Sequence, residues 1–149
     1  MDNLDKKILN LLQKDSSQPI ADIAKKVGLS ASPCWKRIKK MISDGVIIRQ
    51  CAHLDYFLVG FGLIAFVSIK TKEHSDNWLQ NFSNQICLMP EVLEFYRMAG
   101  DVDYMLKVVA KDINAFDKFY KELVKIPGLS EVTSRFSMEK IKDDDVLPL

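Results

Sequence analysis

Cysteine, histidine and long apolar runs are all scarce in this sequence of 149 residues. The three cysteines, Cys34, Cys51 and Cys87, show no paired spacing, and the two histidines are equally scattered, so we predict no metal site. No run approaches the ~20 apolar residues of a membrane-spanning helix, and no signal peptide precedes the first helical pattern. We therefore expect a protein of the reducing cytoplasm that has no membrane partner.

Catalytic motifs are missing as well. The sequence contains no nucleophile–base constellation, GxSxG, P-loop or GxGxxG. His53 and His74 fall in a linker and a polar loop, where a catalytic base would still need an orienting partner. We predict no catalytic residue, no cofactor and no enzyme. Cys34 falls on the core side of a predicted helix, which favours a packed thiol over a redox sensor.

Charge is present but unevenly distributed. The whole chain has a net charge of +1, yet residues 1–50 contain ten Lys/Arg and five Asp/Glu, a net of +5. Residues 51–149 contain eleven Lys/Arg and fifteen Asp/Glu, a net of −4. A basic lobe is an electrostatic footprint for phosphates, whereas DNA would repel an acidic lobe. The two parts of the chain are therefore expected to have different tasks.

Residues 20–43 are predicted to form two helices joined by a tight turn. The first has apolar residues at the spacing of one buried helical face: Ile20, Ile23, Ala24 and Val27. Gly28 can adopt the positive φ that ends such a helix, and Ser30 can cap the next one. In the second helix the inward positions are Ala31, Cys34 or Trp35, Ile38, Met41 and Ile42.

The outer side of that second helix carries hydroxyls and cations. Ser32, Lys36, Lys39 and Ser43 lie opposite the apolar side, with Arg37 and Lys40 beside them. A rigid helix of this kind fits the major groove of DNA. A solvated basic face on an ordinary helical hairpin is the alternative. For Trp35, core packing and DNA contact both remain open.

The hydrophobic period changes along the chain and predicts an α+β fold. Residues 1–50 show three helices followed by a β segment, a winged helix-turn-helix; residues 51–62 read as a β linker with hinge glycines. Residues 63–149 alternate as βαββαβ, the ferredoxin-like arrangement. Apolar side chains of the first strand face both sides of the predicted sheet, for example Phe66 on one side and Val67 on the other. Two helices can cover only one of these sides. We therefore predict a homodimer with sheet facing sheet.

The segment AGDVDY, with Asp101 and Asp103, allows two interpretations. Gly and Asp are ordinary turn residues, so it can be a simple hairpin turn. Alternatively it is a small-ligand pocket, in which a carboxylate binds an amino group and free N–H groups near Gly100 bind a carboxylate.

Taken together, these stretches resemble the Lrp/AsnC (feast/famine) family of transcriptional regulators. LDKKILNLLQKD, IADIAKKVGLSASPCWKRIKKMISDGVI, AGDVDYMLKV, PGLSEVTSRFSMEKIK and LPL carry the resemblance over nearly the whole chain. SPCWKRIKK, MPEVLEFYRMAGD and GLSEVTS are most similar to the branch of the cysteine detoxification regulator. Two positions depart from the family: acidic residues in IKDDDVLPL, and Val102 where an aromatic residue is common.

The resemblance implies a regulator that binds double-stranded DNA as a dimer, often in a tetramer of dimers, and responds to an amino acid held between ferredoxin-like (RAM) domains. Carried onto this chain, it implies DNA contacts from Ser30, Ser32, Lys36, Arg37, Lys39 and Lys40. It implies effector contacts from Met98, Gly100, Asp101, Asp103, Tyr104, Thr133 and Ser134. The alternatives are a siroheme decarboxylase-like enzyme, for which His53 and His74 are poorly placed, and a ligand-binding module without a DNA role.

Overall fold

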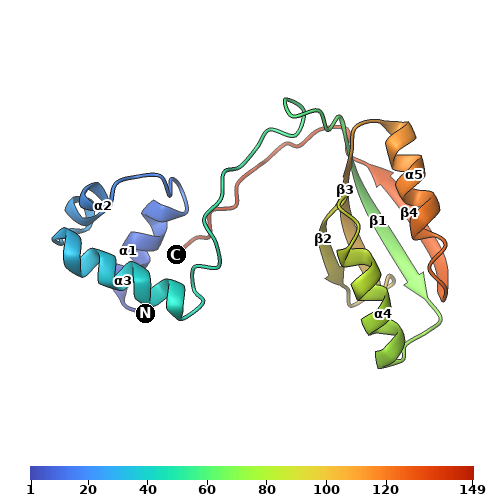
Figure 1. Cartoon of the computed structure of the whole chain (residues 1–149), viewed down its shortest axis with the longest axis horizontal. Coiled ribbons are helices and arrows are strands. Elements are labelled where there is room, and N and C mark those ends of the chain that lie inside the picture. Colours follow the sequence, from blue (N-terminus) through green and yellow to red (C-terminus); the bar gives the residue numbers. More distant parts are fainter. The chain divides into compact units, whose positions relative to one another are not determined.

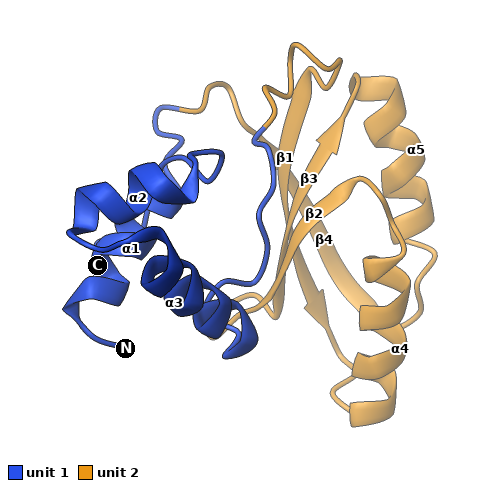
Figure 2. Cartoon of the chain, turned by 60° about the vertical axis from the view of Figure 1, so that its left-hand side comes forward, with its two compact units in different colours: residues 1–53, 141–149 blue, residues 54–140 orange.

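The computed structural model describes all 149 residues and divides them into two compact units (Figure 2). Residues 1–53 and 141–149 form the first unit, and residues 54–140 form the second. No helix in either unit combines the length and the apolar character that crossing a membrane requires.

Three helices build the first unit: α1 (Asn3–Leu12), α2 (Ile20–Val27) and α3 (Ala31–Ser43) (Figure 1). Asp2 starts α1 through a reciprocal capping box with Asp5, and Gly28 ends α2 at a φ of +74°. The predicted apolar faces meet in one small core, made of Ile8, Leu12, Ile23, Ala24, Val27, Cys34, Ile38 and Met41. The predicted helix-turn-helix is therefore confirmed, and Cys34 is fully buried, which raises the pKa of its thiol.

The β segment predicted after α3 does not form in this chain. Gly45 ends the helical region at a φ of +74°, and residues 46–62 contain no strand. A strand needs a neighbour to accept and donate its backbone hydrogen bonds, and these residues pair with no other strand of the chain. The apolar side chains that suggested a strand are solvent-exposed instead; Ile48 is 90% exposed.

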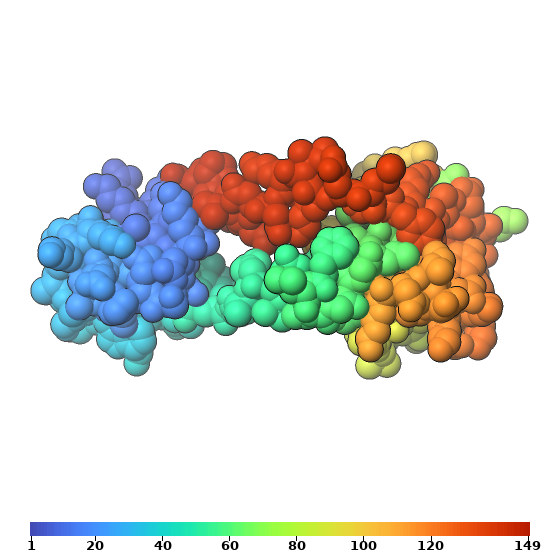
Figure 3. Space-filling model, turned by 90° about the horizontal axis from the view of Figure 1, so that it is seen from above, coloured from blue at the N-terminus to red at the C-terminus, as the bar shows by residue number.

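The last residues of the chain return to the first unit. The side-chain amide of Gln13 makes two hydrogen bonds with the backbone of Leu147. Its nitrogen donates to the Leu147 carbonyl at 2.8 Å, and its oxygen accepts the Leu147 N–H at 2.9 Å. Asn10 donates to the Leu149 carbonyl at 3.3 Å. In Figure 3 these last residues, coloured red, lie against the blue residues of the first helices. By its contacts, the C-terminal tail, residues 141–149, groups with the unit of α1.

The second unit has the predicted βαββαβ order. Its elements are β1 (Leu63–Thr71), α4 (Asp76–Cys87), β2 (Val92–Arg97), β3 (Tyr104–Ala110), α5 (Ile113–Leu123) and β4 (Leu129–Phe136). The strands pair antiparallel in the order β2-β3-β1-β4, so β1 and β3 are central and β2 and β4 are edges. This confirms the ferredoxin-like fold.

Both helices of this unit cover the same face of the sheet (Figure 2). Ser75 and Asp112 cap α4 and α5 by accepting hydrogen bonds from the Trp78 and Ala115 N–H groups. Beneath them, every second residue of β1 and β3 is buried, as the alternation predicted: Ala65, Val67, Ile69, Tyr104, Leu106, Val108 and Ala110.

The other face of the sheet is less apolar than the sequence suggested. Phe66, which is 42% exposed, pairs in register with Lys107 on one side and Arg135 on the other. The Lys107 ammonium donates to Glu94 at 2.7 Å, and this bond holds the pKa of Glu94 below its usual value. Charged side chains on neighbouring strands therefore border the apolar part of this face.

Candidate DNA-binding surface and effector turn

The outward face of α3 carries four predicted or ambiguous DNA residues in one row. Cys34, Ile38 and Met41 fix the opposite side of the helix in the core. Ser32, Trp35, Lys36 and Lys39 therefore face solvent, at the i, i+3, i+4, i+7 spacing of one helical stripe. We call these four residues the α3 stripe.

Trp35 belongs to this stripe and not to the core. Its side chain is 41% exposed, and the Lys39 ammonium lies 5.1 Å from the centre of its ring. The indole thus helps to position a cation at the surface. Of the two interpretations of Trp35, core packing is wrong, because Cys34 already occupies the adjacent inward position.

Arg37 is attached to α1. Its Nη1 lies 2.7 Å from an oxygen of Asp2 and 2.8 Å from an oxygen of Asp5. The pKa values of both carboxyls lie below their usual range, first because each accepts a backbone N–H in the capping box, and then because of the Arg37 guanidinium. The predicted DNA contact of Arg37 therefore competes with two carboxylates that already hold it.

The remaining predicted DNA residues differ in whether their side chains already pair with other residues of the chain. Lys40 pairs with Asp44 at 2.6 Å but is largely exposed, whereas Lys36 makes no ion pair. Ser30 starts α3 in an extended conformation and its hydroxyl makes no capping bond, contrary to expectation. The Ser30 hydroxyl and the unpaired first N–H groups of α3 thus lie together at the positive end of the helix dipole.

The turn between β2 and β3 is tied to the end of β1 by Asp103. Its carboxylate accepts the Thr71 N–H at 2.8 Å, its backbone N–H donates to Ile69, and its carbonyl accepts the Met98 N–H. Gly100, at a φ of +142°, allows the chain to reverse between Met98 and Asp103. Asp103 is thus a structural residue of the turn, as the hairpin interpretation requires.

The other predicted effector residues divide between solvent and core. Met98 is 41% exposed and Asp101 is exposed, so both are accessible beside Gly100. Tyr104 is only 4% exposed, because its ring packs among Trp78, Phe82 and Phe95 under α4. Of these predicted residues, Met98 and Asp101 are therefore accessible at the turn, and the ring of Tyr104 is not.

Thr133 and Ser134 point to opposite faces of the sheet. Thr133 pairs in register with Ser68 on the face without helices, and Ser134 pairs with Val67 on the helix-covered face. Both residues lie on β4, which β1 separates from β3 and hence from the turn. The structure does not bring these two residues and the Gly100 turn into one site within the chain.

Two functional features had no usable signal in the sequence. Asp2 and Asp5 lie at the start of α1, and nothing in the sequence pairs them with Arg37, more than 30 positions away. Gln13 likewise showed no sign of holding the C-terminal tail. Elsewhere, no three His, Cys, Asp or Glu side chains gather closely enough to hold a metal ion.

Two parts of the chain match known families. Residues 1–48 match the winged helix-turn-helix DNA-binding family, and residues 64–147 match the Lrp/AsnC ligand binding domain. The chain belongs to the Lrp/AsnC family. It is a DNA-binding transcriptional regulator with a ligand-binding domain, and the α3 stripe lies in the DNA-binding half of this Lrp/AsnC protein.

Relatives of this Lrp/AsnC protein are similar over their whole length. It is 47% identical to the DNA-binding transcriptional activator DecR of Escherichia coli K12, over 100% of this chain and 99% of DecR. An AsnC family regulator from Agrobacterium tumefaciens is 53% identical, with a TM-score of 0.94 over 99% of this chain and 97% of that one. A Neisseria meningitidis regulator in complex with L-methionine is 30% identical, with a TM-score of 0.94 over 99% and 96%. All are regulators, and none is named as an enzyme.

Proposed function

We propose that this regulator contacts DNA through the α3 stripe and changes its assembly or DNA affinity when an amino acid binds its ferredoxin-like domain. The proposal of DNA binding rests on the α3 stripe, an exposed row of two cations, a hydroxyl and an aromatic ring. The opposite side of the same helix is packed in the core of the unit. Such a row can enter a major groove without any rearrangement of the unit.

Within this surface we assign different roles to the predicted residues. Lys36 and Lys39 contact phosphates, with Ser32 and Trp35 beside them on the α3 stripe. Ser30 and the first N–H groups of α3 add a site for one phosphate. Lys40 contributes weakly because of Asp44, and Arg37 positions α3 against α1.

We infer that the second unit pairs with that of another copy through its helix-free face. Phe66 supplies exposed apolar surface there, and the Lys107–Glu94 pair gives the face a fixed charge pattern that two copies can match by two-fold symmetry. A homodimer would place two α3 helices on a pseudo-palindromic DNA site, and dimers could gather into a tetramer of dimers.

The effector is proposed to be an amino acid bound beside the Gly100 turn, between copies of the ferredoxin-like domain. Met98 and Asp101 are the accessible side chains there, and Asp101 can accept the ligand ammonium. Asp103 keeps the turn in shape, and Thr133 would have to come from another copy. L-cysteine is the first candidate, from the resemblance to the cysteine detoxification branch; L-methionine, bound by the Neisseria relative, is the second.

The division of labour follows the two units. Residues 1–50 bind DNA, residues 51–62 link, and residues 63–149 bind the effector and assemble, except that the tail, residues 141–149, serves the DNA-binding unit. We propose that the protein has no catalytic activity and acts in the cytoplasm, where its DNA and amino acids are found together.

The test is footprinting on DNA beside the protein's own gene, alone and with L-cysteine, L-methionine, L-leucine or L-glutamate. We expect a protected pseudo-palindrome whose protection changes with one of the four amino acids. Affinity should fall steeply with salt, with a log–log slope near −0.9 for each phosphate neutralised. Affinity that stays flat from low to moderate salt would rule out the phosphate contacts, and protection unchanged by all four amino acids would rule out these four as effectors.

A further inference from the structure

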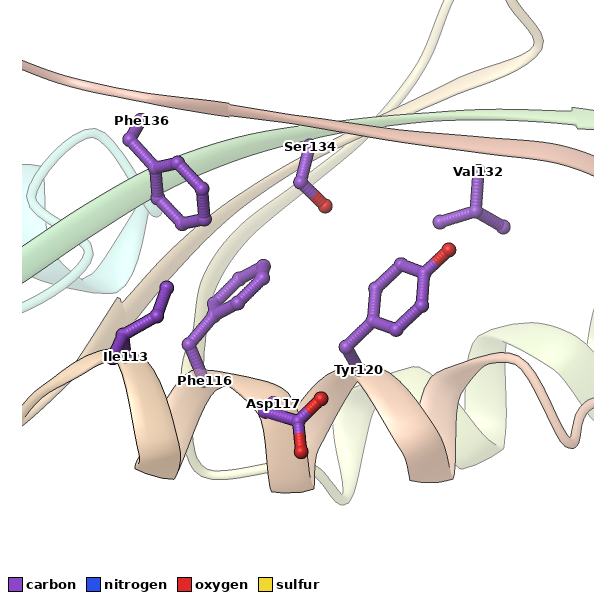
Figure 4. Close-up of a pocket in the computed structure, with 7 residues that line it drawn as sticks. All are labelled: Ile113, Phe116, Asp117, Tyr120, Val132, Ser134 and Phe136. Carbon is purple, nitrogen blue, oxygen red and sulfur yellow. The ribbon is translucent and has the colours of Figure 1, made fainter.

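A hollow of about 320 Å³ lies between α5 and β4, at the edge of the sheet (Figure 4). It belongs to the helix-covered face and to the β4 edge, whereas the Gly100 turn connects β2 and β3 across the sheet. Its lining includes Ile113, Phe116, Asp117 and Tyr120 from α5, and Ser134 and Phe136 from β4. No role in the proposed regulation uses it.

Ser134 is the unusual residue of this hollow. Val132, Ser134 and Phe136 alternate along β4 toward α5, so a small serine stands where its neighbours are a large aliphatic and an aromatic residue. The missing side-chain volume leaves space. The Ser134 hydroxyl is also buried without any hydrogen-bond partner, a condition rare in folded proteins unless a water or a ligand satisfies the group.

The walls of the hollow suit a flat apolar molecule. The rings of Phe116 and Phe136 meet edge to face with centroids 5.0 Å apart, and the ring of Tyr120 lies further along the same side of α5, 6.4 Å from that of Phe116. Figure 4 shows the Ser134 hydroxyl above the gap between the Phe116 and Tyr120 rings, and the Tyr120 hydroxyl on the strand side at the far end of its ring, beside Val132. The Tyr120 hydroxyl makes no hydrogen bond, so two polar groups are available beside an aromatic surface.

The charge around the hollow selects against anions. Asp117 is the charged residue of the lining, and no lysine, arginine or histidine lines the hollow. One Asp117 oxygen accepts from Lys121 at 2.5 Å, and the other makes no hydrogen bond. The second Asp117 oxygen can therefore attract a ligand ammonium, whereas a ligand carboxylate would find no cation in the lining to pair with.

We propose that this hollow is a second small-molecule site, distinct from the amino-acid site at the turn, and that it binds an aromatic amine without a carboxylate. The aromatic ring packs against the exposed sides of the Phe116 and Tyr120 rings, and the ammonium donates a hydrogen bond to the Ser134 hydroxyl, while Asp117 supplies the negative charge that favours a cation in the hollow. The proposal does not depend on DNA binding or on the effector at the turn.

Phenethylamine is the probe, because L-phenylalanine is the same molecule with a carboxylate added. The full chain carries ¹³C-labelled isoleucine methyl groups, which remain visible in large assemblies. Ile113 lines the hollow, and Ile64 lies on the opposite face of the sheet as an internal reference. We expect phenethylamine to shift the Ile113 signal at millimolar concentration without shifting Ile64, and L-phenylalanine to bind at least about fivefold more weakly.

The matched variants are Ser134→Ala and Thr133→Ala, which are adjacent on β4 but face opposite sides of the sheet. Ser134→Ala should weaken phenethylamine binding about fivefold, and Thr133→Ala should leave it unchanged. Equal affinity for the two probes, no Ile113 shift, or equal effects of the two variants would each overturn the proposal. If dilution alone shifts Ile113 and the probe does not, a second copy of the chain covers the hollow and the proposal is wrong.

Discussion

The polar side chains of the two units lie in different environments. In the first unit the polar residues that matter for function lie outside a small core: Lys36 and Lys39 project from α3, while Arg37 is held by two carboxylates of the first turn of α1. In the second unit the polar residues that looked functional hold the fold: Asp103 binds the end of β1, and Tyr104 is buried under α4. A helix exposes its polar face by its period, whereas a turn first uses its polar groups to satisfy its own backbone.

The charges show the same contrast. Residues 1–53 carry a net charge of +5, the acidic C-terminal tail contributes −2, and the first unit therefore carries +3. The second unit, residues 54–140, carries −2. The higher net charge of the first unit favours phosphate binding there. The acidic tail makes the difference in net charge between the units smaller but does not remove it.

The largest expected effect is on DNA affinity. Replacing Lys36 and Lys39 together by alanine should lower affinity about 100-fold at moderate salt and reduce the salt slope by about 1.8, because two phosphate contacts are lost. Fluorescence anisotropy with the footprinted site measures both values. The control is Lys6→Ala with Lys7→Ala, which removes the same charge from α1. An equal loss in the control would mean that net charge, and not the α3 stripe, binds DNA.

The next effect tests the structural role of Asp103. Asp103→Ala should lower the free energy of unfolding of the second unit by about 1–3 kcal/mol, because the Thr71 N–H loses its acceptor. Asp103→Asn should retain most of the stability, and Asp101→Ala should change it by less than about 0.5 kcal/mol. Trp78 fluorescence during urea unfolding, in a Trp35→Phe background, reports this unit. A stable Asp103→Ala protein that no longer responds to any amino acid would restore Asp103 as a ligand-binding residue.

A smaller effect distinguishes positioning from base recognition at Arg37. Arg37→Gln should destabilise the first unit, because α3 loses its link to Asp2 and Asp5, while affinity for DNA changes less than about threefold. Binding to a set of single-base variants of the site should keep its order of preference. A relaxed preference at one base pair would show that Arg37 leaves its carboxylates and reads that base.

The smallest effect concerns acid. The pKa values of Asp2 and Asp5 are lower in the folded protein than in the unfolded chain, so these carboxylates stabilise the fold above their usual pKa near 3.8. This stabilisation is lost as the pH falls through the lowered values. Between pH 5 and 3 the first unit should therefore lose stability, and Arg37→Gln should lose less. Identical acid profiles, followed by Trp35 fluorescence in a Trp78→Phe background, would contradict the link.

Periodicity predicted most of the fold, and its failures have specific causes. The α3 stripe follows from the 3.6-residue repeat, but Cys34 and Trp35 are adjacent on the boundary of the inward face, and only packing decided between them. The β segment after Gly45 failed because a strand depends on a partner that the chain does not supply. Thr133 and Ser134 were assigned to one site although neighbours in a strand face opposite ways, which the sequence already implied. Arg37 and its carboxylates, far apart in sequence, could not be paired without coordinates.

The return of residues 147–149 to α1 also sets the order in which the protein can mature on the ribosome. Gln13 and its partner Leu147 are 134 positions apart. At ~5–20 residues per second, about 7 to 27 s of translation separate them. The ferredoxin-like unit is synthesised entirely within that interval and can fold before α1 gains its last contacts. A nascent chain can therefore form the core of α1, α2 and α3 first, and α1 gains its contacts with the tail only after the whole ferredoxin-like unit has been synthesised.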